Sequence, residues 1–230
     1  MGPAMMKLFT TPASSFVRKV TVTMRELGLE DRIELVPTRW PHTWGTHTVP
    51  FRPEFADASP VGRIPALVTD DGLHLCDSSV ICEYLNADHG DYRLCPATGK
   101  ERWRIHAVIS IANAVLEAQA ARRAETLRAK SDKPNEYSQD FVNKMVARQD
   151  RCYRVLDGMI AEFPSAPDLG QIAVGAACGI SDFRFRDTWR PSYPNLARWY
   201  EAFRERPSMR ATEPAETPTE PDSVRTSAAS

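Results

Sequence analysis

Two short apolar runs separated by an amphipathic stretch predict a strand, a helix and a second strand at the start of the chain. Residues 7–11 form an apolar run with β propensity, and the PASS sequence that follows supplies a turn and helix-capping oxygens. The helix has an apolar stripe and a stop signal at Gly28. Residues 33–36 predict the second strand, which Pro37 ends because proline cannot donate to a ladder of hydrogen bonds. The stripe consists of Phe16, Val17, Val20, Met24 and Leu27.

A hairpin and another helix are predicted after a long loop. Residues 37–62 are rich in Pro, Trp, His and Thr, and predict a partly irregular loop that partly replaces a helix. The runs IPALVT and LHLC predict two short strands, joined by a DDG turn whose glycine tolerates positive φ. The sequence DSSVICEYLN then places side-chain oxygens at a helix start. One face of this helix carries Val80, Ile81, Tyr84 and Leu85.

From about residue 100 the strand signals vanish, and apolar positions recur with helical period. A second long helix is predicted over 138–163. Residues 169–181 are apolar on nearly every face, as expected of a central helix, and Asp168 with Gln171 forms a capping pair at its start. The expected buried stripes are Trp103, Ala107, Ile111, Ala114 and Val115 in the first long helix, and Phe141, Met145, Cys152, Val155, Leu156, Met159 and Phe163 in the second.

Changes in composition divide the chain into two domains with short flanking segments. Residues 87–99 have the glycines, proline and polarity of a connection, and residues 212–230 are dominated by Pro, Glu, Ser and Thr, which predicts a disordered tail. We therefore predict an N-terminal extension at 1–6, an α/β domain at 7–86 and, after the linker, an all-α domain at 100–211.

Composition and charge exclude several classes of function. With 230 residues, 42% hydrophobic and 26% charged, the chain can bury a globular core. Its 29 Lys and Arg against 30 Asp and Glu leave no large positive field, so nucleic acid is not an expected partner. No run of about 18 apolar residues predicts a membrane span. The five cysteines form no CxxC pair and no zinc-type ladder with histidine, which favours reduced thiols in the cytoplasm and no metal.

An α/β layer of this order followed by an all-α half resembles the glutathione S-transferase family. The resemblance rests on Ser14 beside the first helix, on GRIPALV at 62–68, on LCDSSVICEYL at 75–85, and on the helix that begins DLGQIAVGAACG. It covers the chain to about residue 211 and points to a bacterial, serine-type, theta- or beta-like member. It implies a thioredoxin-like N-terminal domain, an all-helical C-terminal domain, glutathione as co-substrate and a homodimer.

The family match implies a site for the cysteinyl part of glutathione at Ile64 and Pro65. An X-Pro bond adopts the cis form at modest cost, and the resemblance implies a cis Ile64–Pro65 bond. The N–H and C=O groups of Ile64 would then face an extended peptide, which pairs with them as an added strand. The alternative is that Pro65 only starts an exposed strand.

Asp77 and Ser78 precede a helix, where N–H groups and a hydroxyl can receive a carboxylate. The resemblance assigns this place to the γ-glutamyl group, with Asp77 accepting from its ammonium. The alternative is that both residues only cap the helix. For the glycine carboxylate, Arg63 is the first candidate, beside Arg39 and His42.

Conjugation needs glutathione as thiolate, although a free thiol with a pKa of ~8.5 is mostly protonated at neutral pH. A hydroxyl donating to sulfur at a helix start favours the anion. The resemblance puts Ser14 in this role, with Ser15 as the adjacent alternative. Thr10 and Thr11 stand where tyrosine-type members carry a tyrosine, and the absence of cysteine there makes disulfide exchange the less expected reaction.

The electrophile is expected on the helical side of the cleft. Candidate residues for its site are Trp40 in the long loop, together with Trp44 and His47, and Asn113, Glu117, Arg122 and Arg123 on the first long helix. The leading interpretation is a cytoplasmic, homodimeric glutathione transferase that conjugates small hydrophobic electrophiles, with a role in detoxification. The alternatives are a glutathione-dependent isomerase, dehalogenase or peroxidase, or a non-catalytic binding or scaffold protein with the same fold.

Overall fold

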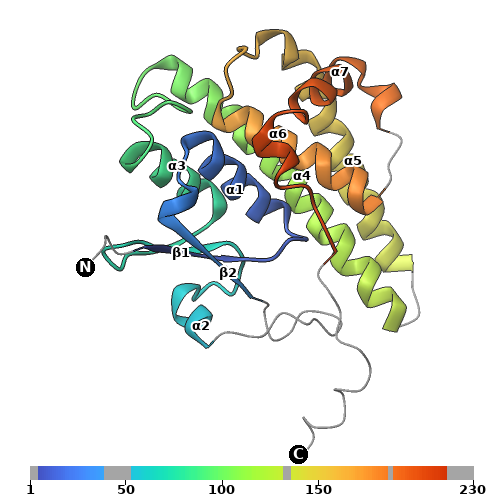
Figure 1. Cartoon of the computed structure of the whole chain (residues 1–230). Coiled ribbons are helices and arrows are strands. Elements are labelled where there is room, and N and C mark those ends of the chain that lie inside the picture. Colours follow the sequence, from blue (N-terminus) through green and yellow to red (C-terminus); the bar gives the residue numbers. More distant parts are fainter. Residues whose placement is uncertain (1–4, 39–52, 132–135, 186–188, 217–230) are drawn as a thin grey trace, which may run out of the picture.

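The computed structural model describes residues 5–38, 53–131, 136–185 and 189–216. They form an α/β layer followed by a helical domain, as expected (Figure 1). No helix among these residues is both long enough and apolar enough to cross a membrane.

The N-terminal domain is built on a mixed four-stranded sheet of order β2-β1-β3-β4. β1 (Met6–Thr10) runs parallel to β2 (Ile33–Pro37) and antiparallel to β3 (Ala66–Val68), which pairs antiparallel with β4 (His74–Cys76). The predicted hairpin is therefore present. The first strand begins one residue earlier than expected, because the fully buried Met6 belongs to the sheet and not to the extension.

Helices cover both faces of the sheet. α1 (Ser15–Leu27) and α3 (Ser78–Asp88) cover one face, and the short α2 (Glu54–Ala58) lies on the other (Figure 1). Side chains alternate across a strand, so Leu8 joins the large core under α1 and α3 while Phe9 packs on the α2 side.

α2 corrects the expectation of an irregular loop over 37–62. Phe55 and Ala58, three residues apart, are buried against the sheet, and a five-residue helix is too short to show a periodic pattern. Residues 39–52 of the expected loop lie outside the described residues.

The helical domain packs around α6 (Leu169–Ile180), all of whose residues are buried. Asp168 caps it, since its Oδ1 accepts from the Gln171 N–H at 2.8 Å. The Gln171 side chain does not return this bond and donates to Pro164 O instead. Around α6 lie α4 (Lys100–Ser131), α5 (Glu136–Met159), α7 (Pro194–Phe203) and α8 (Pro207–Arg210). This domain also has 3-10 turns at Ile160–Glu162 and Arg190–Ser192 and a π-helical turn at Ser181–Phe185, and the N-terminal domain has a 3-10 turn at Glu30–Arg32 before β2.

The expected buried stripes of α4 and α5 are wrong in part. Trp103 is 69% exposed, and Phe141 and Val155 are 40% and 50% exposed. Val115 and Leu156 are buried as expected. Polar residues also take part in the buried faces, so the apolar pattern alone placed part of each stripe on an exposed side of its helix. The buried face of α4 includes Ile105, Val108, Ala112, Val115 and Gln119, and that of α5 includes Gln149, Tyr153 and Leu156.

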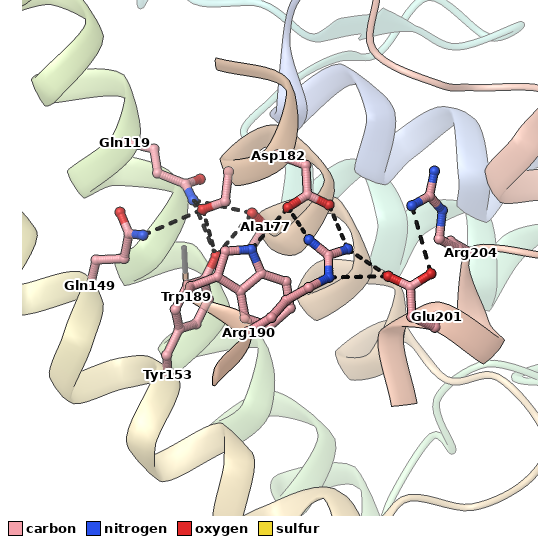
Figure 2. A network of polar contacts seen from close by, with 10 residues as sticks. Gln119, Gln149, Tyr153, Ala177, Asp182, Trp189, Arg190, Glu201 and Arg204 are labelled. Carbon is pink, nitrogen blue, oxygen red and sulfur yellow. Dashed lines mark hydrogen bonds and ion pairs between the residues drawn. The ribbon is translucent and has the colours of Figure 1, made fainter. Parts of the chain in front are cut away.

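An interior cluster of four buried polar residues (Gln119, Gln149, Tyr153 and Ser181) joins α4, α5 and the end of α6 (Figure 2). The Ser181 hydroxyl lies 2.7 Å from Gln119 Nε2 and 2.9 Å from the Tyr153 hydroxyl. Both partners also donate to the carbonyl of Ala177. Beside this cluster, Asp182 accepts from Arg190 and from the Trp189 indole, so polar contacts fix how the helices meet.

Two contacts of α1 dock the domains. The buried Arg18 side chain crosses α6 at Gly179, where an added Cβ would lie 2.0 Å from its Nη1, and donates to Met209 O on α8. At the other end of α1, Glu26 accepts two hydrogen bonds from Arg206, at 2.8 and 2.9 Å. Only glycine leaves room for the first contact.

The C-terminal tail expected over 212–230 lies mostly outside the described residues. At its described start, the Thr212 hydroxyl donates to Ser208 O at 2.8 Å.

Candidate functional site

A cleft of about 450 Å³ lies between the β3–β4 side of the sheet and α4. It brings together most of the side chains proposed from the sequence for glutathione and for the electrophile. Its lining residues are Phe16, Val61, Arg63, Ile64, Pro65, Cys76, Asp77, Ser78, Asn113 and Glu117.

The segment before β3 forms one wall of the cleft. The Ile64–Pro65 bond is cis, as expected. Ser59, at the end of α2, holds the backbone of Arg63, the residue before the cis bond. Its hydroxyl donates to Arg63 O at 2.8 Å and accepts from Arg63 N at 3.1 Å. The Arg63 side chain is exposed at the rim.

The N-terminus of α3, which directly follows β4, lines the cleft beside this segment. Asp77 caps the helix, as its Oδ1 accepts from Ser79 N at 2.7 Å and from Val80 N at 3.4 Å. Its φ of 80° is rare for a residue with a side chain, and such backbone strain concentrates at functional sites. The hydroxyl of Ser78 has no hydrogen-bond partner among the described side chains and backbone groups, and its N–H belongs to the first turn, which lacks intrahelical acceptors.

Ser14 stands at the start of α1, as the sequence predicted, and caps it. Its hydroxyl accepts from Val17 N at 3.3 Å. Ser14 lines a second hollow, of about 350 Å³, between α1 and the end of β1, and not the cleft itself. Ser15 is buried, and Phe16 is the first α1 residue that reaches the cleft.

The structure separates Arg122 from the other proposed electrophile residues. Its guanidinium lies 4.0 Å from the ring centre of Phe185 and donates to Gln149. Asn113 and Glu117 do line the cleft. Trp40, Arg39, His42, Trp44 and His47 lie outside the described residues.

Sequence analysis missed Lys19 and Ser79. Lys19 is buried, and its ammonium donates to Ser79 Oγ and to Asn113 Oδ1, each at 2.9 Å. Asn113 Nδ2 also donates to Ser79 Oγ at 2.9 Å. The three residues form a second polar group, the cleft cluster. The available signal was a lysine on the same side of α1 as Phe16, in a helix that is buried at nearly every position.

The five cysteines are free. Burial raises the pKa of the thiols of Cys82 and Cys178, and it raises that of Cys95 to about 12. Cys76 lines the cleft, and its thiol donates to Ala58 O. None lies at the start of α1, where disulfide exchange would need a nucleophile.

One group of potential metal ligands occurs among the described residues. Ligand atoms of Glu83, Cys95 and His106 lie within 4.8 Å of one another. The Arg102 guanidinium occupies this place, since its Nη1 lies 3.0 Å from Glu83 Oε2 and 3.8 Å from Cys95 Sγ. The Glu83 carboxylate is therefore already paired with a positive charge.

Fold and cleft together define the class of protein. A mixed sheet with a cis-proline before β3 and a capped helix after β4 is a thioredoxin-like layer, here joined to a helical domain. Residues 13–88 match the sequence profile of the glutathione S-transferase N-terminal domain, and residues 114–202 match that of the C-terminal domain. The chain belongs to the glutathione S-transferase family.

Individual relatives align over almost the whole chain. The uncharacterized GST-like protein YibF of Escherichia coli K12 is 26% identical, across 91% of this chain and 98% of that protein. Glutathione S-transferase GstB of the same strain is 28% identical, across 90% and 96%. A glutathione transferase family member from Pseudomonas fluorescens Pf-5, crystallised with bound glutathione, is 34% identical with a TM-score of 0.81, across 92% of this chain and 100% of that chain.

Proposed function

We propose that this chain is a serine-type glutathione transferase, which binds glutathione in the cleft, stabilises its thiolate and conjugates it to small hydrophobic electrophiles. The observation that carries the proposal is the convergence of Ile64, Asp77 and Ser78 on one cleft. Its volume of about 450 Å³ is within the range of small-molecule sites. The similarity to a protein crystallised with glutathione supports the same ligand.

In this proposal each part of the tripeptide has its own partner. The cysteinyl backbone pairs with Ile64 as an added strand. The γ-glutamyl carboxylate binds the first turn of α3 at Ser78, where N–H groups and the positive helix end favour an anion. Asp77 uses one oxygen as the helix cap and has the other for the ligand's ammonium. Arg63 at the rim pairs with the glycine carboxylate.

Ser14 is the proposed thiolate stabiliser. Its oxygen accepts from Val17 N–H, which leaves the hydroxyl proton free to be donated to sulfur. The electrophile then meets the α4 wall at Asn113 and Glu117. Trp40 remains a secondary proposal for this pocket, and Ser15 is the alternative to Ser14. Arg122 contacts Phe185 and Gln149 instead and is not proposed for the pocket.

The proposed partner in assembly is a second copy of the chain. Val80 on α3 and Trp103 on α4 are 49% and 69% exposed. The two helices meet here, because Glu83 lies one turn after Val80 and pairs with His106, whose ring is 6.0 Å from that of Trp103. Exposed apolar residues on adjoining helices suit a homodimer interface.

The test is calorimetric titration of glutathione, together with a conjugation assay using an aryl halide. Loss of a charge-assisted bond worth ~1.5–3 kcal/mol should weaken binding to Asp77→Ala by about 10- to 100-fold. Asp88→Ala, at the other end of the same helix, is the matched control. Ser14→Ala should keep its affinity and lose about 10- to 100-fold in turnover.

The same experiment separates the alternatives. If Ser15→Ala loses turnover and Ser14→Ala does not, the roles of the two serines are exchanged. Binding without turnover of any electrophile would favour a non-catalytic protein, a reading that the position of Ser14 in the neighbouring hollow supports. No binding of glutathione to the wild type would overturn the proposal.

A further inference from the structure

Lys19 is the buried charge nearest to the cleft. It is 2% exposed and extends from α1 to the first turn of α3 and to α4. Both of its hydrogen-bond acceptors, Ser79 Oγ and Asn113 Oδ1, are neutral. No carboxylate of the described residues lies within ion-pair distance of its ammonium.

A buried ammonium in this position has an unfavourable desolvation free energy, because burial disfavours a charge unless an opposite charge compensates it. Burial accordingly lowers the pKa of Lys19, whereas Cys82 and Asp77 act to raise it. The Asp77 Oδ1 accepts from the N–H groups of Ser79 and Val80, and the carboxylate does not lie within ion-pair distance of the ammonium. Among the residues that the structure describes, the positive charge of Lys19 therefore has no anionic partner.

The position of this charge shows what could compensate it. Ser79, to which Lys19 donates, directly follows Ser78, and Ser78 lines the cleft whereas the buried Lys19 is not among the lining residues. The ammonium therefore stands behind the helix N-terminus, on the protein side, while an anion bound there would lie on the cleft side. The charge and the helix end attract the same anion.

We infer that Lys19 is a positioning residue for an α-carboxylate at the N-terminus of α3: it fixes Ser79 and Asn113, and its buried charge is compensated when the γ-glutamyl carboxylate binds. The inference rests on the proposed function, since it takes glutathione as the ligand. Beyond that function, the inference explains why this end of the cleft would select a ligand that carries a carboxylate.

The test compares two ligands on two lysine variants. The ligands are glutathione and its analogue with 4-aminobutyrate in place of γ-glutamate, which lacks the α-carboxylate but keeps the ammonium on the same carbon. A third ligand, γ-glutamylcysteine, keeps the γ-glutamyl group and lacks glycine. The variants are Lys19→Met and the matched control Lys7→Met, which removes an exposed lysine from β1.

The expected result is selective. Lys19→Met should weaken glutathione and γ-glutamylcysteine by about 10- to 100-fold, as expected for loss of a favourable interaction of ~1.5–3 kcal/mol with a charge. It should weaken the 4-aminobutyryl analogue about threefold or less, since that ligand carries no carboxylate at this place. Lys7→Met should bind all three ligands as the wild type does.

Lys19→Gln guards against loss of folding and separates charge from shape. Its amide can bond Ser79 and Asn113 but carries no charge, so it should show the same selective loss as Lys19→Met. Equal weakening of all ligands, or wild-type affinities in Lys19→Gln, would overturn the inference and leave Lys19 a structural support. Absence of glutathione binding to the wild type would instead overturn the proposed function.

Discussion

The long helix α4 carries two polar clusters that differ in what surrounds them. Asn113 belongs to the cleft cluster with Lys19 and Ser79, and Gln119, less than two turns later, belongs to the interior cluster. The interior cluster is enclosed by the helical domain and contains no charged side chain. The cleft cluster joins the two domains, contains a charge, and borders open space through Asn113.

This difference indicates different roles: the interior cluster specifies the fold, and the cleft cluster also recognises a ligand. The four members of the interior cluster bond one another and the carbonyl of Ala177, so their partners belong to the protein. The cleft cluster leaves a positive charge with neutral partners. Substitutions in the first cluster should therefore change stability alone, and those in the second should change binding as well.

The largest effect is expected for Tyr153→Ala. Tyr153 is fully buried, and its ring lies 5.4 Å from Trp189 and 5.7 Å from Tyr193. Removal of a buried aromatic side chain lowers the free energy of unfolding by about 3–5 kcal/mol, which urea denaturation measures. Affinity of the folded variant for glutathione should not change, and a weakened affinity would contradict the separation of the two clusters.

Asn113→Ala should have a smaller effect on stability and a distinct one on binding. It removes one of the two acceptors of a buried ammonium, which costs about 1–3 kcal/mol. Because Lys19 and Ser79 then lose their support, glutathione should bind about tenfold more weakly. Calorimetry beside urea denaturation measures both quantities. Loss of stability with unchanged affinity would place Asn113 with the interior residues.

Glu26 offers a third kind of polar contact, a charge pair between domains, and its effect should depend on pH. Burial alone would raise its pKa, but hydrogen bonds from Arg206 and Ser208 and the charge of Arg206 lower it below the ordinary value of 4.5. A carboxylate with a lowered pKa stabilises the fold above its unfolded pKa, and this contribution is lost as pH falls through the folded pKa.

Glu26→Gln should therefore lower the free energy of unfolding by about 1–2 kcal/mol at neutral pH. The difference from the wild type should shrink below about pH 4. Urea denaturation of both proteins across this range measures it. A difference that persists in acid would mean that packing, and not the charge, carries the contact.

The smallest effect is expected for Tyr153→Phe. The ring stays, and only the hydroxyl bonded to Ser181 and Ala177 is lost. A single neutral hydrogen bond contributes about 1 kcal/mol to the free energy of unfolding. Comparison with Tyr153→Ala then divides the contribution of this residue between ring packing and polar contact, and a loss above about 3 kcal/mol would show that the cluster acts cooperatively.

Much of the N-terminal domain could be predicted from sequence, because its signals are local. Ser14 and Gly28 cap α1 as expected, and in the helical domain the local signal of Asp168 likewise predicted the cap of α6. The hairpin follows from its DDG turn, and the predicted helix start is present, with Asp77 as the cap of α3 and Ser78 as its first residue. Each of these features depends on a few neighbouring residues and on the preferences of turns and helix ends.

The rest depends on contacts distant in sequence. The apolar periodicity predicted Trp103 and Val155 as core residues, but both are exposed. The buried faces of the same helices include Gln119 and Gln149 instead. Lys19 escaped notice for the same reason, since its partners lie 60 and 94 residues away. Polar groups can be buried when partners satisfy them, and a one-dimensional pattern does not show those partners.

The burial of the cysteines has a chemical consequence for a protein proposed to act on electrophiles. Such a protein carries competing nucleophiles of its own, and the thiolate is the form that is alkylated. With the pKa of Cys95 raised to about 12 and those of Cys82 and Cys178 raised by burial, these three stay protonated and shielded. Burial also raises the pKa of the half-buried Cys152, which is not among the residues that line the cleft. Self-modification by a bound electrophile is thereby directed to Cys76 at the cleft wall, so slow inactivation during turnover should follow alkylation there, and bound glutathione should protect against it.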